Sequence, residues 1–131
     1  MLKAIVKNIQ IQEIIHLVEF DLNGSTLKMI SLELNEKIKI GTKVSLCIKS
    51  THITIAKDLQ GELSCSNKIK AKVKTVNNAK LLSSVILEIN EDLLEAIITS
   101  DSSKQMNLKN DDEVIVLIKA SEISIKDIID D

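Results

Sequence analysis

The sequence predicts an all-β protein built from two tandem five-stranded barrels, each with at most a short helix. The residues Val-Ile-Val-Leu-Ile-Lys-Ala-Ser-Glu-Ile-Ser-Ile at positions 114–125 have a counterpart in Val-Ser-Leu-Cys-Ile-Lys-Ser-Thr-His-Ile-Thr-Ile at positions 44–55. The apolar residues are almost all Ile, Leu and Val, and branching at Cβ suits Ile and Val to strands. The 131-residue chain is therefore interpreted as a tandem duplication, with one repeat at residues 1–60 and the other at residues 64–131. A repeat of this size buries too little surface to be stable alone, so the two should pack together or oligomerise.

Each repeat is expected to supply five strands. They are predicted at residues 2–11, 18–22, 26–34, 44–49 and 52–55 in the first repeat and at residues 69–76, 85–89, 93–99, 114–119 and 122–125 in the second. The second strand of each repeat ends at an asparagine, Asn23 or Asn90, which tolerates the positive φ of a hairpin turn. Lys70, Lys72 and Lys74 alternate onto the outer side of their strand, as a solvated sheet face or as a basic stripe. The last two strands are expected to complete the barrel of their own repeat.

The repeats differ before the fourth strand. The second repeat has a longer connection there, and its sequence predicts a short helix at residues 102–106, capped by Ser or Asp, with Met106 and Leu108 turned inward. The first repeat has only residues 34–38 at this place, which is too short for much of a helix.

The fourth strands also differ on their second face. Ile115 and Leu117 occupy this face in the second repeat, where the first repeat has Ser45 and Cys47. The second repeat is therefore expected to bury both faces of this strand, one of them against another subunit or domain.

Charge and composition exclude several classes of function. Seventeen basic and nineteen acidic side chains give a formal charge of −2, and Phe20 is the only aromatic residue. The chain thus offers neither a positive field nor stacking platforms for a nucleic acid. Polar residues interrupt the N-terminal segment every few positions, so neither a signal peptide nor a membrane-spanning helix is expected.

Cysteine and histidine usage does not indicate an enzyme or a metal site. Cys47 and Cys65 lie on no metal-binding or redox spacing, and an unpatterned pair suits a reducing cytoplasm. His16 has no Cys or His close to it in sequence, and isolated residues of these types do not suggest a nucleophile and its base. The glycine-rich phosphate loop of a transport ATPase is missing as well. No catalytic residue and no metal ligand are predicted.

Four segments of the chain resemble the Mop (TOBE-like) domain of the molbindins, a family of small molybdate- and tungstate-binding proteins. Ser-Cys-Ser-Asn at residues 64–67 is similar to the family's Ser-Ala-Arg-Asn opening, and residues 96–102 resemble its strand-to-helix segment. Leu-Lys-Asn-Asp-Asp-Glu-Val at residues 108–114 is similar to its Leu-Lys-Glu-Gly-Asp-Glu-Val turn, and residues 118–122 to its Ile-Lys-Ala-Thr-Glu. The first repeat matches through residues 48–51 and Gly41.

This resemblance implies an OB-like β-barrel in each repeat and an assembly, most often a trimer, with oxyanion sites at interfaces between domains. The implied oxyanion-binding residues are Ser64, Thr99, Ser102, Lys119, Ala120 and Ser121, with Lys49, Ser50 and Thr51 as counterparts in the first repeat. Ser31 or a residue beside it would correspond to Thr99. Two positions depart from the family pattern, because Ser66 replaces its arginine and Asp111 its turn glycine.

The chemistry of these residue types is independently suitable. A tetrahedral oxyanion is held by hydroxyls, backbone N–H groups and a compensating cation, and small residues allow close approach of the backbone. Lys119 and Lys49 each supply a cation just before small residues. The alternative is that a lysine at the end of a buried strand only extends its ammonium to water. Recurrence of the pattern in both repeats favours the ligand role.

The predicted function is that of a cytoplasmic molybdate- or tungstate-binding protein for storage or homeostasis, without catalysis and with no cofactor besides its oxyanion ligand. A homo-oligomer is expected, with a trimer favoured, and neither nucleic acid nor membrane is expected as a partner. The alternative is an oligomeric interaction or regulatory ligand-sensing module with weak or lost oxyanion sites. The loss of the arginine at Ser66 removes a charge-assisted donor, which is the feature that keeps this alternative open.

Overall fold

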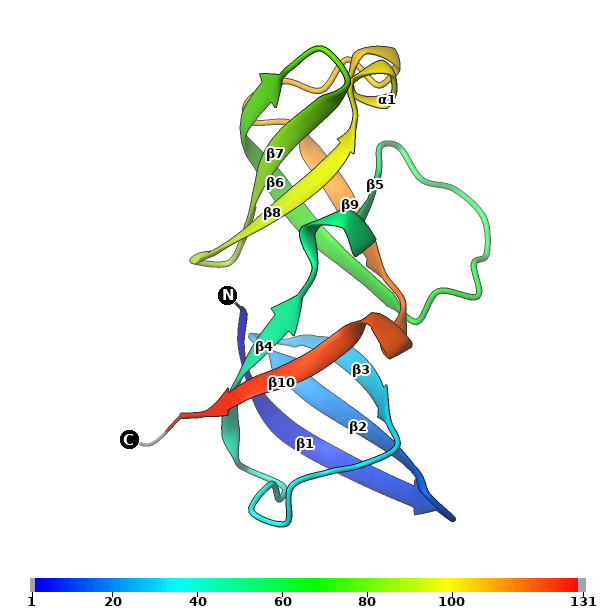
Figure 1. Cartoon of the computed structure of the whole chain (residues 1–131), viewed down its shortest axis with the longest axis vertical. Helices are drawn as coiled ribbons and strands as arrows, with labels where there is room; N and C mark the ends of the chain where they lie inside the picture. Colours follow the sequence, from blue (N-terminus) through cyan, green and yellow to red (C-terminus); the bar gives the residue numbers. More distant parts are fainter. Residues whose placement is uncertain (1, 130–131) are drawn as a thin grey trace.

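The computed structural model describes residues 2–129 and contains two five-stranded antiparallel sheets with one short α-helix (Figure 1). The first sheet has the order β10-β4-β1-β2-β3 and the second has the order β5-β9-β6-β7-β8. The strands are β1 (Leu2–Gln12), β2 (Ile15–Leu22), β3 (Ser25–Ser31), β4 (Lys43–Ile48), β5 (Thr54–Ala56), β6 (Asn67–Asn78), β7 (Leu82–Ile89), β8 (Asp92–Thr99), β9 (Glu113–Ile118) and β10 (Ile123–Ile128). The predicted fold class, all-β with two OB-like five-stranded units, is confirmed.

The same turn chemistry builds both sheets. Asn23 and Asn90 close the β2–β3 and β7–β8 hairpins with φ of 54° and 57°, as predicted. Gly41 and Asp111 both adopt a positive φ before the fourth strand of their repeat, and each donates its N–H over 2.7 Å to a carbonyl oxygen, that of Val6 or Val73. Aspartate tolerates this left-handed conformation, so loss of the turn glycine at Asp111 leaves the turn intact.

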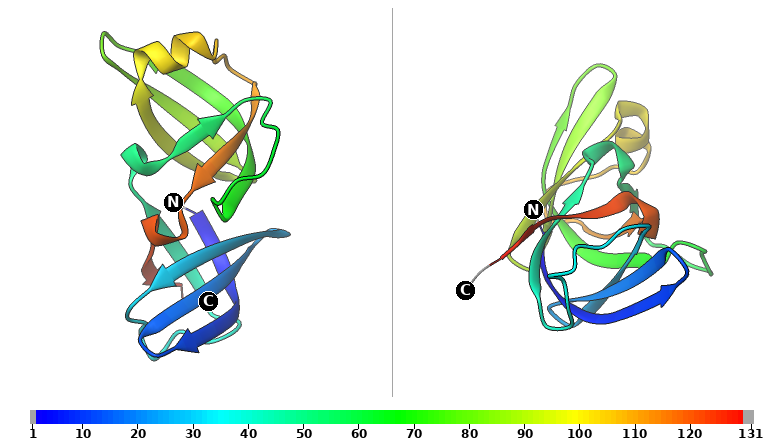
Figure 2. Two further views of the ribbon diagram at one scale, coloured as in Figure 1. Left: turned by 90° about the vertical axis from the view of Figure 1, so that its right-hand side faces the viewer. Right: turned by 60° about the horizontal axis from the view of Figure 1, so that its bottom comes forward.

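The last strand of each repeat lies in the sheet of the other repeat. β10, from the second repeat, pairs with β4, and Ile123 lies opposite Ile48. β5, from the first repeat, pairs with β9, and Thr54 lies opposite Leu117. The expectation that the last two strands complete the barrel of their own repeat is therefore wrong (Figures 1 and 2). The boundary between residues 60 and 64 stays a prediction about the sequence repeats.

Alternating side chains fill the inside of both sheets. Buried residues include Val18, Phe20 and Leu27 in the first sheet and Val85 and Leu87 in the second. They belong to one continuous apolar cluster that also takes in Ile53, Ile55 and Ile123 from the exchanged segments. At 20–33 cal/mol per Å² of apolar surface, such burial is the main term that favours the folded chain.

The connections before β4 and β9 differ as the sequence predicts. The helix α1 spans Ser100–Gln105, two residues earlier than expected at its start, and Leu108 beyond it is buried. Its N-cap is Thr99 rather than Ser or Asp, because the Thr99 Oγ1 accepts the N–H of Ser102 at 3.2 Å. The first repeat has no helix between β3 and β4.

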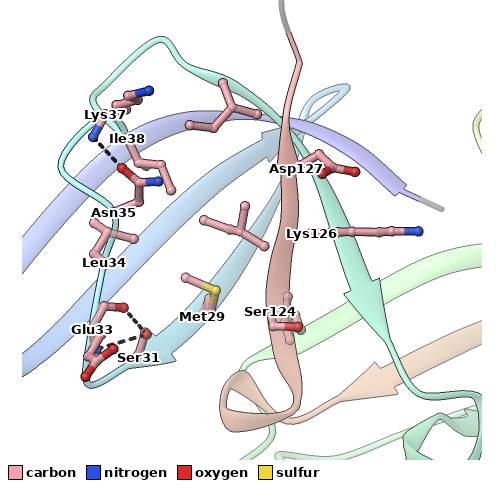
Figure 3. Close-up of a pocket in the computed structure, with 13 residues that line it drawn as sticks. Met29, Ser31, Glu33, Leu34, Asn35, Lys37, Ile38, Ser124, Lys126 and Asp127 are labelled. Carbon is pink, nitrogen blue, oxygen red and sulfur yellow. Dashed lines mark hydrogen bonds between the residues drawn. The ribbon is translucent and has the colours of Figure 1, made fainter.

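The shorter connection leaves a groove of about 480 Å³ beside the first sheet (Figure 3). Met29, Leu34 and Ile38 line one of its walls and β10 forms the other.

Ile115 and Leu117 are half-buried on the second face of β9, and the expectation that another subunit or domain covers this face stays a prediction. The first sheet has Ile15, Ile30 and Leu32 exposed on its outer face, with Leu17 opposite Ile30.

Candidate functional site

The two chain crossings between the sheets bring the lysine segments of both repeats together. The chain leaves β4 at Ile48, passes through the 3-10 turn η1 (Ser50–His52) and enters the second sheet as β5. It leaves β9 at Ile118, passes through η2 (Ala120–Glu122) and returns to the first sheet as β10. We call residues 49–52 and residues 119–122 the crossover turns. They lie side by side between the two sheets (Figures 1 and 2).

The crossover turns have the same local geometry. Lys49 and Lys119 are extended, with φ of −67° and −66°, and directly precede η1 and η2. The N–H of His52 donates to the Lys49 carbonyl at 2.9 Å, and the N–H of Glu122 donates to the Lys119 carbonyl at 2.9 Å. The sequence similarity of the two segments therefore corresponds to a structural repeat.

A side-chain contact joins the two crossover turns. The Nδ1 atom of His52 lies 2.7 Å from Oε2 of Glu122. These residues occupy the same place in their turns, so the turns face each other about a local pseudo-twofold axis.

The crossover turns present cations and hydroxyls to solvent. Lys49, Thr51, Lys119 and Ser121 are exposed, whereas Ala120 is buried. Among residues 2–129, neither lysine ammonium makes a hydrogen bond or an ion pair with a protein group. Both charges are therefore available to a ligand.

A pocket of about 310 Å³ beside η1 is less suitable for an anion. Ser50 and Cys47 line it together with Leu93, Leu94 and Glu95 of β8. Glu95 lines the same space, and a like charge disfavours an anion there. The exposed lysines are more suitable for an anion than this pocket.

Thr99 and Ser102 lie far from the crossover turns in the same chain. Thr99 is five residues, or about 17 Å of strand, beyond Leu94, which lines the pocket beside η1. The Thr99 hydroxyl donates to the Ser102 Oγ at 2.9 Å, so the two residues cap α1 together. One chain does not combine these hydroxyls with Lys49 or Lys119.

Ser64 lies nearer to the second crossover turn. It is exposed and comes three residues before Asn67, which pairs with Ile118 next to Lys119. The described contacts do not join Ser64 to the crossover turns.

The first repeat has no hydroxyl at the place of Thr99. Met29 and Ala96 are equivalent, since they pair with Val18 and Val85 in the two repeats. Counting three residues onward makes Leu32, rather than Ser31, the counterpart of Thr99.

Asn67 is a structural residue that the sequence interpretation missed. Its fully buried side-chain amide accepts the N–H of Lys28 at 2.7 Å and donates to the Lys28 carbonyl at 2.9 Å. The amide thus satisfies the free edge of β3 and links β6 of the second sheet to the first. Its place in the Ser-Cys-Ser-Asn segment was the available signal.

Lys57 forms a second link between the repeats. Its Nζ, just after β5, donates to the Met106 and Asn107 carbonyls at 3.1 and 3.3 Å and lies 3.1 Å from Oδ2 of Asp112. The Lys109 N–H donates to the same carboxylate at 2.9 Å. This backbone hydrogen bond, and after it the Lys57 ammonium, lower the pKa of Asp112.

Neither a metal site nor a membrane-spanning helix is found in residues 2–129. No group of three His, Cys, Asp or Glu side chains in this part of the chain is arranged to hold a metal ion. Within the same residues, no helix has the length and apolar character needed to cross a bilayer.

The sequence and the fold of the chain are similar to those of known proteins. Residues 63–125 match the TOBE domain family. No curated protein matches the sequence. A crystal structure of the cytoplasmic molybdate-binding protein ModG with molybdate bound superposes with a TM-score of 0.87 at 21% identity, over 95% of this chain and 92% of that chain. The molybdate-binding protein from Sporomusa ovata gives a TM-score of 0.49 at 28% identity, over 51% of this chain and 100% of that chain. Most of the second repeat thus matches the TOBE domain family, and the chain as a whole has the fold of ModG.

Proposed function

We propose that the protein is a tandem two-domain member of the Mop (TOBE-like) molybdate-binding family, with domains at residues 1–60 and 64–131, and that it binds molybdate or tungstate at the crossover turns. One observation carries this proposal: Lys49 and Lys119 each directly precede one of two turns that meet through His52 and Glu122, and both lysines are exposed without a protein partner for the ammonium group within the described residues. Two such cations in a chain of net charge −2 favour a small doubly charged anion over an extended polyanion.

The neighbouring side chains suit a tetrahedral oxyanion. Such an ion needs several hydrogen-bond donors around one or two cations. Ser50, Thr51 and Ser121 supply hydroxyls at the crossover turns, and Ala120 leaves room for the backbone to approach. ModG, whose fold the chain shares, binds molybdate, which makes molybdate the first anion to test.

We infer that a second copy of the chain contributes the remaining ligands. Thr99 and Ser102 lie at the far end of β8, and each already has a partner in α1. Only another chain could bring Thr99 and Ser102 to a crossover turn. The exposed apolar face of the first sheet offers a surface for this assembly, and we favour a trimer.

The proposed role is storage or homeostasis of the anion in the cytoplasm, without catalysis and without a further cofactor. ModG is a cytoplasmic protein, which supports this location. Neither nucleic acid nor membrane is proposed as a partner.

Calorimetric titration with molybdate, tungstate, sulfate and phosphate in parallel tests the proposal. We expect saturable heat with molybdate or tungstate and weaker binding of sulfate and phosphate. The second candidate is an interaction or ligand-sensing module with lost sites, which Ser66 favours because it replaces a cationic donor. An assembled protein that gives no saturable heat with any of the four anions would establish this candidate instead.

A further inference from the structure

His52 and Glu122 are equivalent residues of the two repeats that meet across the pseudo-twofold axis. Each is the fourth residue of its crossover turn, and their side chains approach to 2.7 Å. An exact duplication with glutamate at both places would put two carboxylates in contact, which repel each other strongly at this distance. Histidine in the first repeat replaces that repulsion with an interaction between a ring nitrogen and a carboxylate.

The contact links the backbones of the two lysines through short connections. The His52 N–H donates to the Lys49 carbonyl and the Glu122 N–H to the Lys119 carbonyl, both at 2.9 Å. Each side chain of the pair is thus one closed turn away from a lysine. Movement of the His52 ring relative to Glu122 would therefore shift one crossover turn relative to the other.

The surroundings make the pair sensitive to charge. His52 and Glu122 have 39% and 35% of their side-chain surface exposed, so water screens the contact only in part. η1 lies on β8, which carries the Glu95 carboxylate, and η2 lies on β3, which carries Lys28. Without His52, the Glu122 carboxylate beside the proposed anion site would have no hydrogen-bond partner among the described residues.

We propose that His52 and Glu122 are positioning residues that set the oxyanion affinity of the crossover turns, which rests on the proposed function. The contact between His52 and Glu122 holds the two crossover turns together, and with them the backbone that carries Lys49 and Lys119. The pair also couples the two turns, because anion bound at one of them restrains the other.

A charge-swap series tests this role. His52→Glu places two carboxylates together and should weaken molybdate binding by about tenfold or more, the range of one charge-assisted hydrogen bond. The double variant His52→Glu/Glu122→His restores the pair in reversed order and should recover most of the affinity. His16→Glu is the matched control, since that ring contacts only the Ile14 carbonyl at the far end of the first sheet, and it should bind like the parent.

The outcomes separate the proposals. The positioning role is overturned if the double variant binds molybdate no more tightly than His52→Glu and circular dichroism shows that both are folded. The proposed function would remain intact in that case. A parent that binds no oxyanion overturns both. If His52→Glu does not fold, His52→Gln, Glu122→Gln and their combination replace it. The pair acts as a unit if the combination loses no more affinity than the weaker-binding single variant, and additive losses refute the coupling.

Discussion

The side-chain amide of Asn67 makes the two hydrogen bonds with the edge of β3 that the backbone of a neighbouring strand would otherwise make. The amide pairs with both backbone groups of Lys28 on the free edge of β3 and is itself fully buried. An unpaired buried donor or acceptor costs about as much as the hydrogen bond it has lost. This residue therefore contributes to the stability of the contact between the two sheets.

Asn67→Ala should destabilise the protein by about 1–3 kcal/mol, because it removes two hydrogen bonds and leaves a cavity between the sheets. Thermal or urea unfolding measures the loss. Ser66→Ala, at the exposed neighbouring position, serves as the control and should unfold like the parent. Equal stability of the two variants would mean that the hydrogen bonds of the Asn67 side chain make no net contribution to the stability of the folded chain.

Asp112 gives the stability a dependence on acid. Its folded-state pKa is lowered by the Lys109 N–H and by Lys57, so the carboxylate stabilises the folded chain above its ordinary pKa of about 3.9. That contribution should be lost as the pH falls through the lower folded-state pKa. Asp112→Asn should reduce stability at pH 7 and flatten the decrease below about pH 4.

Urea unfolding at several pH values between 7 and 3 measures this dependence. Asp111→Asn keeps the Lys57 contact and should follow the parent, since asparagine also tolerates the positive φ at this position. An Asp112→Asn profile parallel to that of the parent across this range would show that the carboxylate has no special role.

At the level of elements, alternation and turn residues predict which segments form strands but not which sheet each joins. The edges of β4 and β9 are built from equivalent residues, Val44 and Leu46 against Val114 and Val116. A strand such as β5 or β10 can therefore pair with either edge. Connection length decides between them, because η1 and η2 carry the chain across rather than back.

The same limit applies to the candidate site. Similar motifs in both repeats could predict that Lys49 and Lys119 are equivalent, but the meeting of the two crossover turns through His52 and Glu122 follows from the strand exchange. Thr99 has the residue type of a ligand, yet its hydroxyl caps α1, a role that sequence does not distinguish from ligand binding.

Strand exchange predicts that the two repeats do not fold separately. Residues 1–60 alone lack β10 and residues 64–131 alone lack β5, so each fragment has an unpaired edge and an incomplete core. Each fragment should be largely unfolded as a monomer, and mixing the two should restore strand structure and one unfolding transition. Circular dichroism and light scattering would record this, and a stable folded monomer of either fragment would contradict it.

At the scale of the whole molecule, the outer face of the first sheet indicates assembly. Ile15, Ile30 and Leu32 are exposed there, whereas the residue equivalent to Leu32 in the second sheet is Thr99. An apolar face of this kind on a small protein commonly marks an interface. Assembly through this face is the proposed way to bring Thr99 and Ser102 of one chain to a crossover turn of another.

The chain should therefore form an oligomer, with a trimer favoured, at micromolar concentration. Ile30→Lys with Leu32→Lys places two charges on this face and should shift the assembly toward monomers without unfolding each sheet, because both side chains point away from the core. Light scattering measures the mass. Ile40→Lys, at an exposed apolar residue in the connection before β4, is the control. A parent that is monomeric at this concentration would contradict the prediction.

Titration calorimetry of the parent, Lys49→Ala and Lys119→Ala with molybdate tests most directly whether the crossover turns bind an oxyanion. Loss of the main cation at a site should reduce affinity about ten- to a hundredfold, since a charged hydrogen bond is worth roughly 1.5–3 kcal/mol. Lys72→Ala, on the exposed face of β6, should bind like the parent. If the crossover turns hold the anion, each of the two variants binds weakly while keeping the oligomeric state of the parent. If both variants bind molybdate as tightly as the parent, the lysines only extend into solvent and the site lies elsewhere.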